Sequence, residues 1–275
     1  MKKIVPLILL ACLFTGNTDS QPKAATPYLP TLPTVQVLAS DSVHIPTLIQ
    51  KARWGSGEAY IQLAICYKEG KGVQQDLFGF FYMMMMAKEH GVSEEVKEYL
   101  AALPEDDEFK YLYEVLNYSK SETKEQVNNI NARIAKMKCR DAQNVKALLN
   151  ILQGETEQDN PDLDKAIEAG SQLAIIAKLS LEQHAVNASV IQKWEAMTDQ
   201  FPFVHMIIAN VLRKSENPAK HIKQIAHHYI QAEKLALLDR VGADYLLHYH
   251  ENGGSVQLSK QDVKRLKAFL GRSED

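Results

Sequence analysis

One stretch, residues 57–91, constrains the fold of this chain more than any other: GEAYIQLAICYKEGKGVQQDLFGFFYMMMMAKEHG. Its pattern predicts a first helix over 57–69, which Gly70 and Gly72 end because glycine enters positive φ at little steric cost. Asp76 is placed to cap a second helix over 77–90 by accepting hydrogen bonds from its free first-turn amides. Gly91 then ends that helix. The stretch therefore predicts a pair of helices joined by a tight turn.

Small and apolar side chains fall where the two helices of this pair would touch. The first helix places Ala59, Leu63, Ala64 and Tyr67 on one side, and Ala87 lies on the second helix. Alanine lets two helix backbones approach closely, as stacked helix pairs require. Val73, between the helices, is expected to plug the turn against the pair.

In the rest of the chain, the spacing of the apolar residues also predicts helices. Val127, Ile130, Ile134 and Met137 recur at intervals of three and four residues, which is the spacing of one helical face. No run of alternating β-branched residues predicts a strand, so we expect an all-α fold. Many helices form antiparallel pairs whose starts lie about 30 to 40 residues apart, a period typical of helical solenoids. The expected helices are 47–54, 57–69, 77–90, 94–103, 106–119, 121–138, 141–153, 161–169, 171–184, 187–199, 201–213, 218–237, 241–250 and 259–270.

The spaced residues of the opening stretch resemble the Sel-one-like repeat, a relative of the tetratricopeptide repeat. The match covers one unit of about 36 residues, and its positions are Ala59, Leu63, Tyr67, Gly70, Gly72, Val73, Asp76, Ala87 and Gly91. Fragments of further units occur at 165–174 and 243–256. The stretch departs from the family pattern at Gly79, Phe80, Met83 and Met84. The resemblance implies that residues 47–275 form a right-handed α-solenoid of antiparallel helix pairs.

The resemblance also implies a function without catalysis. Sel-one-like repeats stack into a curved superhelix whose concave face binds proteins or peptides, and family members often act as adaptors. We therefore expect a protein or peptide partner, no cofactor and no enzymatic activity. Secreted relatives that act on β-lactams carry a cysteine pair in each unit, which Cys66 and Cys139 do not reproduce.

The first 46 residues predict export followed by a tether. Residues 1–16 combine the basic pair Lys2 and Lys3 with a short apolar core, as an export signal does. Two cleavage sites compete: a lipobox-like Leu-Leu-Ala-Cys that would leave Cys12 lipidated, and ordinary cleavage near residues 18–20. Residues 17–46 are rich in proline, which favours an extended chain. The expected location is the periplasm or an outer-membrane anchor in a bacterium.

The composition argues against a nucleic acid partner, and the cysteines allow either a free thiol or one disulfide. The chain carries 31 basic and 34 acidic residues, a formal net charge of −3. No basic excess is available to neutralise a phosphate backbone, so we expect no nucleic acid partner. Cys66, inside an apolar helix, is expected to be a buried free thiol, and a Cys66–Cys139 bridge is the alternative.

Two residue clusters invite a metal-site hypothesis. Met83 to Met86 are consecutive, so on a helix they point about 100° apart and cannot converge on one ion. We expect two of them to face the core and two to face a groove or solvent. Five histidines lie near the C-terminus: His221, His227, His228, His248 and His250. No two of the nine histidines are three or four residues apart, the spacing of helical metal pairs. An envelope enzyme or metal-binding protein with a site assembled between C-terminal helices is the alternative function.

Overall fold

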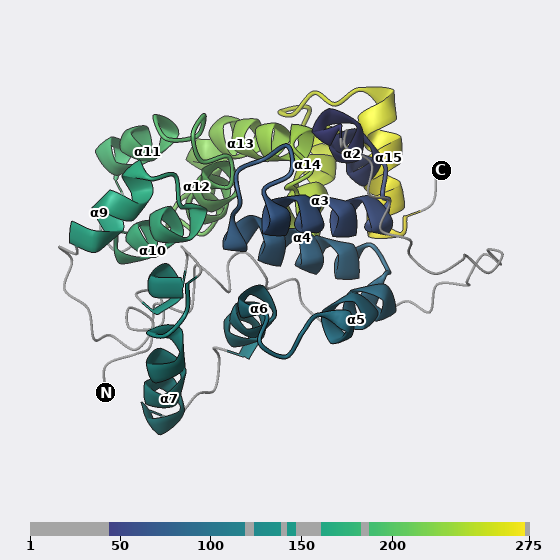
Figure 1. The fold of residues 1–275 in the computed structure, drawn as a ribbon. Coiled ribbons are helices and arrows are strands. Elements are labelled where there is room, and N and C mark those ends of the chain that lie inside the picture. The colour runs from purple at the N-terminus through teal and green to yellow at the C-terminus, as the bar shows by residue number, and fades with distance from the viewer. Residues whose placement is uncertain (1–43, 119–123, 139–141, 147–160, 183–186, 273–275) are drawn as a thin grey trace, which may run out of the picture.

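The computed structural model describes residues 44–118, 124–138, 142–146, 161–182 and 187–272, and Figure 1 shows how their helices are arranged. These ranges contain helices joined by turns and loops, and no strand, which confirms the all-α prediction. The helices are α2 (Ile45–Arg53), α3 (Gly57–Glu69), α4 (Leu77–Glu89), α5 (Ser93–Ala102), α6 (Glu108–Tyr118), α7 (Lys124–Ile134), α9 (Pro161–Glu168), α10 (Gln172–Glu182), α11 (Ala188–Glu195), α12 (Val204–Arg213), α13 (Ile222–Lys234), α14 (Arg240–Asn252) and α15 (Lys260–Leu270), with a short 3-10 helix, η2, at Pro218–His221.

Local chemistry sets the ends of α3 and α4 as the sequence predicts. Ser56 caps α3 by accepting from the amide of Ala59, and Gly70 ends it in the left-handed region at φ +69°. Asp76 caps α4 by accepting from the amide of Gly79 at 2.6 Å. These hydrogen bonds satisfy amides that would otherwise lack a partner at each helix start.

Helix α4 is the centre of the molecule. Ten of its 13 residues are buried, because α3, α5, α6 and α10 all pack against it. Met83, Met84 and Met86 are buried, and Met85 is half-buried. The prediction that two methionines face the core and two face a groove or solvent is therefore wrong. A helix covered on every side needs no polar face, so its methionines serve as adaptable core packing.

Several helix boundaries differ from the expected ones. The largest difference is at 218–237, where a 3-10 turn precedes α13 and the helix ends at Lys234. Ala236, with φ +60°, cannot continue a right-handed helix, which explains the early end. At 187–199 the helix ends at Glu195, and at 201–213 it begins at Val204. Asp107 accepts from the amide of Lys110, so α6 begins at Glu108 rather than at 106. At 121–138 the described helix ends at Ile134, and smaller shifts occur at 47–54, 77–90, 94–103, 161–169, 241–250 and 259–270. Of the helix expected at 141–153, residues 142–146 are helical, and the rest lies outside the described ranges, as do 121–123 and 183–184.

The first and last described helices meet. Sequential helices pack as pairs at α3–α4, α12–α13 and α14–α15. In addition, α4 contacts α10, and Arg53 of α2 binds Glu233 of α13 across 180 residues. Figure 1 shows α2 next to α15, and the guanidinium of Arg265 on α15 lies 5.8 Å from the ring centroid of Trp54 at the end of α2. A simple solenoid keeps contacts between neighbouring repeats, so these long-range contacts go beyond repeat stacking, and the right-handed solenoid stays a prediction.

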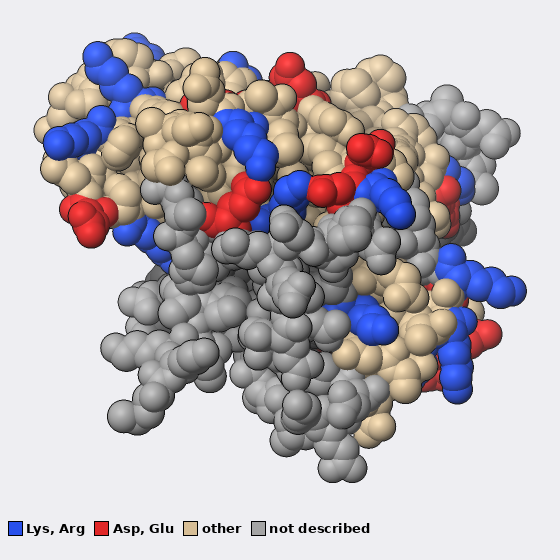
Figure 2. Space-filling view, turned by 90° about the vertical axis from the view of Figure 1, so that its left-hand side faces the viewer, with Lys and Arg blue, Asp and Glu red and all other residues tan. Residues whose placement is uncertain are grey.

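Several predictions concern residues outside the described ranges. Cys12, the export signal at 1–16, residues 17–43 of the tether, and Cys139 all lie there. Cys66 is a buried free thiol, as expected. Within the described part of the chain, no helix combines the length and apolarity needed to cross a membrane. Figure 2 shows both basic and acidic side chains among the described residues on one face of the molecule.

Candidate functional site

A pocket of about 530 Å³ opens where the two ends of the helical array meet. It lies between the end of α2, the end of α4, the link between α13 and α14, and α15. Its size falls within the range of small-ligand sites. The residues that line it are Ala52, Arg53, Trp54, Gly55, Tyr60, Glu89, His90, Gly91, Glu233, Ala236, Leu238, Lys264, Arg265, Leu266, Ala268 and Phe269.

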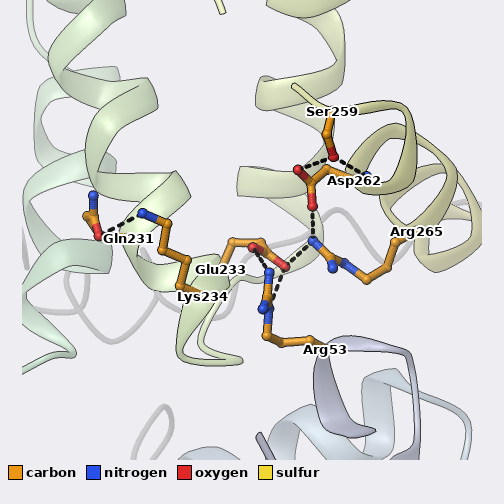
Figure 3. Close-up of polar contacts among 7 residues, drawn as sticks. All are labelled: Arg53, Gln231, Glu233, Lys234, Ser259, Asp262 and Arg265. Atoms are coloured by element: carbon orange, nitrogen blue, oxygen red, sulfur yellow. Dashed lines mark hydrogen bonds and ion pairs between the residues drawn. The ribbon is translucent and has the colours of Figure 1, made fainter. Parts of the chain in front are cut away.

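An ion-pair network holds three helices around this pocket, as Figure 3 shows. Arg53 donates to both carboxylate oxygens of Glu233, at 3.1 Å from Nε and 2.8 Å from Nη2. Arg265 Nη2 reaches Glu233 at 2.5 Å and Asp262 at 2.6 Å. Ser259 in turn donates to Asp262 at 2.6 Å. Bidentate arginine–carboxylate pairs have a fixed geometry, so the network fixes α2 relative to α13 and α15.

Aromatic rings form one wall of the pocket. The His90 ring lies between two others, at 4.8 Å from the Tyr60 ring centroid and 4.4 Å from that of Phe269. Trp54 is the one large hydrophobic side chain that is exposed among the described residues, at 49%. The Arg265 guanidinium lies 5.8 Å from its ring centroid. The wall therefore offers flat apolar surfaces next to a cation.

Burial shifts the pKa of two titratable groups in the pocket toward their uncharged forms. Burial, with a smaller contribution from the charge of Asp239, raises the pKa of Glu89 to about 7. Its Oε2 atom is buried and has no hydrogen-bond partner in the described part of the chain. Burial and the nearby Arg240 lower the pKa of His90 to about 4. The stacked His90 ring is thus a neutral imidazole at pH 7, and Glu89 holds a proton about half the time.

We expect Glu89→Gln to change how stability depends on pH. The folded-state pKa of Glu89 is raised above its unfolded value of 4.5, so wild-type stability falls as pH rises from about 4.5 to about 7. Glutamine cannot ionise and keeps an acceptor for the backbone amide of Arg240. At pH 8 the variant should gain on the order of 2 kcal/mol relative to wild type, since the amide must also be desolvated. Urea unfolding at pH 4 and pH 8 measures this, and an equal difference at both pH values would contradict it.

The C-terminal histidines do not converge on one point. His228 is bonded through Nδ1 to Nδ1 of His205 at 2.8 Å, and its Nε2 lies 3.3 Å from Glu195. Burial, together with His205, lowers the pKa of His228 to about 4. His248 contacts Asn252, and His250 contacts the turn after α14. Within the described ranges, no three histidine, cysteine, aspartate or glutamate side chains are grouped to hold a metal ion.

The repeat-motif residues lie mostly away from the pocket. Ala59, Leu63 and Ala87 are buried between α3 and α4, Val73 packs against the core, and Gly70 and Gly72 adopt positive φ in the turn between these helices. Tyr67 lies against Gly79, where an added Cβ would be 2.5 Å from its ring. Gly91, at φ +87°, is the motif residue that lines the pocket.

The sequence alone did not reveal the pocket. Its acidic and basic residues other than histidine come from positions 53, 89, 233, 264 and 265, and no helical or strand periodicity connects the three regions in which they lie. The one available signal was Trp54, a large apolar residue in the short link between α2 and α3.

Comparisons with known proteins identify no relative of this chain. No family model matches the chain, and searches of curated proteins and of solved structures return no match.

Proposed function

We propose that this protein is a non-catalytic binding protein that holds part of a partner protein or peptide in the pocket between α2, α4 and α15. The observation that carries the proposal is Trp54, a half-exposed tryptophan at a pocket of ligand-binding size. Tryptophan and arginine are among the residues most enriched at interface hot spots, the few positions that supply most of the binding free energy. The ion-pair network supports the proposal, because it holds the pocket in place before any partner arrives.

The cellular setting belongs to the same proposal. We place the protein in the bacterial cell envelope, exported by residues 1–16 and, in the lipoprotein version, anchored through Cys12. A right-handed Sel-one-like solenoid would present the pocket where the two ends of the array come together. The repeat pattern of residues 57–91 and the paired helices support this arrangement.

The alternative is an enzyme or metal-binding protein that uses the C-terminal histidines. The observation in its favour is the contact chain from Glu195 through His228 to His205, since a carboxylate–histidine pair is common in general-base catalysis. The lowered pKa of His228 keeps its ring neutral at pH 7. Elemental analysis of the purified protein distinguishes this alternative from the binding proposal.

We expect Trp54→Ala to weaken partner binding about thirtyfold or more, as loss of a central tryptophan does. A photo-crosslinking amino acid at position 54 would first capture the partner and map the segment that it contacts. The affinity of that segment for wild type and variant is then measured by calorimetry. Lys97→Ala, at an exposed residue on α5 that does not line the pocket, is the control. Equal affinity of Trp54→Ala and wild type would reject the pocket as the binding site.

A further inference from the structure

Two histidines join α12 to α13 through the same ring atom of each residue. Nδ1 of His205 lies 2.8 Å from Nδ1 of His228, and the ring centroids are 5.1 Å apart. His228 is only 2% exposed, and His205 is half-buried. Nε2 of His228 lies 3.3 Å from Oε1 of Glu195 at the end of α11, and the same oxygen accepts from Gln224 of α13 at 2.9 Å. The histidine pair therefore lies where α11, α12 and α13 meet.

The contact with Glu195 determines which nitrogen atoms carry protons at neutral pH. A carboxylate can only accept a hydrogen bond, so Nε2 of His228 is protonated. Nδ1 of His228 is then an acceptor, and Nδ1 of His205 donates to it. The remaining nitrogen, Nε2 of His205, carries no proton in this arrangement.

The pair can take up one further proton but not two. The first can bind Nε2 of His205, because Nδ1 of His205 keeps its hydrogen and still donates to His228. A second proton would have to bind Nδ1 of His228, where it would face the Nδ1–H of His205 across 2.8 Å. Two imidazolium rings also repel each other strongly at a buried contact. Protonation of both rings therefore requires the contact to break.

The charged groups around the pair do not offset two positive charges. Among the described residues, Glu195 and the exposed Asp199 are the acidic groups that act on it, and His227 opposes protonation from the same helix as His228. Burial, with a contribution from the neighbouring histidines, lowers the pKa of His205 and lowers that of His228 to about 4. Below the usual histidine pKa of 6.5, the open form thus binds more protons than the closed form. The closed contact loses stability as pH falls from about 6.5 to about 4.

Another polar contact between α12 and α13 is insensitive to acid. The hydroxyl of Tyr229 donates to Asn210 at 2.8 Å and accepts from Nε of Arg213 at 3.2 Å. None of these three groups gains or loses a proton between pH 7 and pH 4.5. Acid should therefore break the histidine contact and leave this one in place.

We propose that the His205–His228 contact is a pH switch, which holds α13 against α11 and the start of α12 at neutral pH and releases them when both rings are protonated. Trp194 of α11 and Ile225 of α13 are buried in the closed form. Release would bring apolar surface of both helices into contact with water. The switch does not involve the pocket, so it is independent of the proposed function.

Hydrogen exchange of the full chain from pH 7 to pH 4.5, measured by mass spectrometry with EDTA present, tests the switch. Exchange is corrected for its intrinsic pH dependence. Each extra proton bound by the open form should then raise the open fraction of α11 and of residues 222–229 about tenfold per pH unit. The α3–α4 pair is the internal reference and should change much less. No rise in α11 and residues 222–229 down to pH 4.5 would overturn the proposal.

A matched pair of variants assigns the effect to the histidines. His205→Gln keeps a side chain that can donate to His228 or accept from it, but it cannot become charged. The acid-induced rise should disappear in this variant and persist in the control His248→Gln, at an exposed position on α14. An equal rise in His205→Gln and wild type would show that the switch lies elsewhere.

A measurement on the wild type alone covers the case in which His205→Gln does not fold. The ¹⁵N chemical shifts of the ring nitrogens report which of them are protonated. At pH 7 we expect a proton on Nδ1 of His205 and none on Nδ1 of His228. On acidification, both rings should become doubly protonated only as exchange rises. Double protonation of both rings without a rise in exchange would overturn the proposal.

Discussion

Replacing Asp76 with alanine is expected to lower the free energy of unfolding by about 3 kcal/mol, more than the loss of an ordinary helix cap. One carboxylate caps two helices that are far apart in the sequence. Its Oδ1 accepts from the amide of Gly79 at the start of α4, and its Oδ2 accepts from the amide of Gln172 at the start of α10. The residue is only 3% exposed, so water cannot replace either bond. Alanine would leave two helix-start amides without an acceptor in a buried site.

Chemical denaturation of Asp76→Ala and Asp76→Asn measures this effect. Asparagine retains one acceptor oxygen and should fall between alanine and wild type. Ser259→Ala is the control, because Ser259 caps a single helix at an exposed position and should cost about 1 kcal/mol. A loss in Asp76→Ala no larger than in Ser259→Ala would show that the bond to Gln172 adds no stability.

Replacing Gly79 with alanine is also expected to destabilise the protein, by about 2 kcal/mol. Alanine is the better helix former by about 1 kcal/mol in an exposed helix. Here its Cβ would lie 2.5 Å from Cδ1 and 2.6 Å from Cγ of Tyr67, so α3 and α4 would have to separate. Overpacking of this kind outweighs the gain in propensity.

A double-mutant cycle tests whether the ring of Tyr67 is the cause. In a Tyr67→Ala background the clash is removed, so Gly79→Ala should become neutral or stabilising. Urea unfolding of the four proteins gives the coupling free energy. An equal effect of Gly79→Ala in both backgrounds would rule out the close approach as its origin. Gly242 is a second helical glycine without room for a side chain, since an added Cβ would be 2.5 Å from Leu238 and 2.8 Å from Tyr229.

The sequence predicted those features that neighbouring residues determine. The span 57–69 matches α3 at both ends because Ser56 and Gly70 act within one turn of the helix. Asp76 was recognised as a cap for α4, but its second bond to Gln172 joins residues 96 positions apart. No local pattern carries that information. The methionine run was misjudged for the same reason, since the burial of α4 depends on α5, α6 and α10 together.

The candidate site was the least predictable part. Glycine at position 79 was visible only as a departure from the repeat pattern, although its lack of a side chain lets Tyr67 approach α4. No motif in the sequence singles out Arg53, Glu89 or Arg265. They acquire a shared role only because the fold brings the end of α2 against α15.

The pairing of Arg53 with Glu233 also sets an order of events during synthesis. The two residues are 180 positions apart, and at translation rates of about 5 to 20 residues per second the second follows the first by roughly 10 to 40 s. Throughout that interval α2 has emerged from the ribosome without the carboxylate that neutralises its arginine. Helix α2, the first helix of the described ranges, is therefore made long before the residue that secures it.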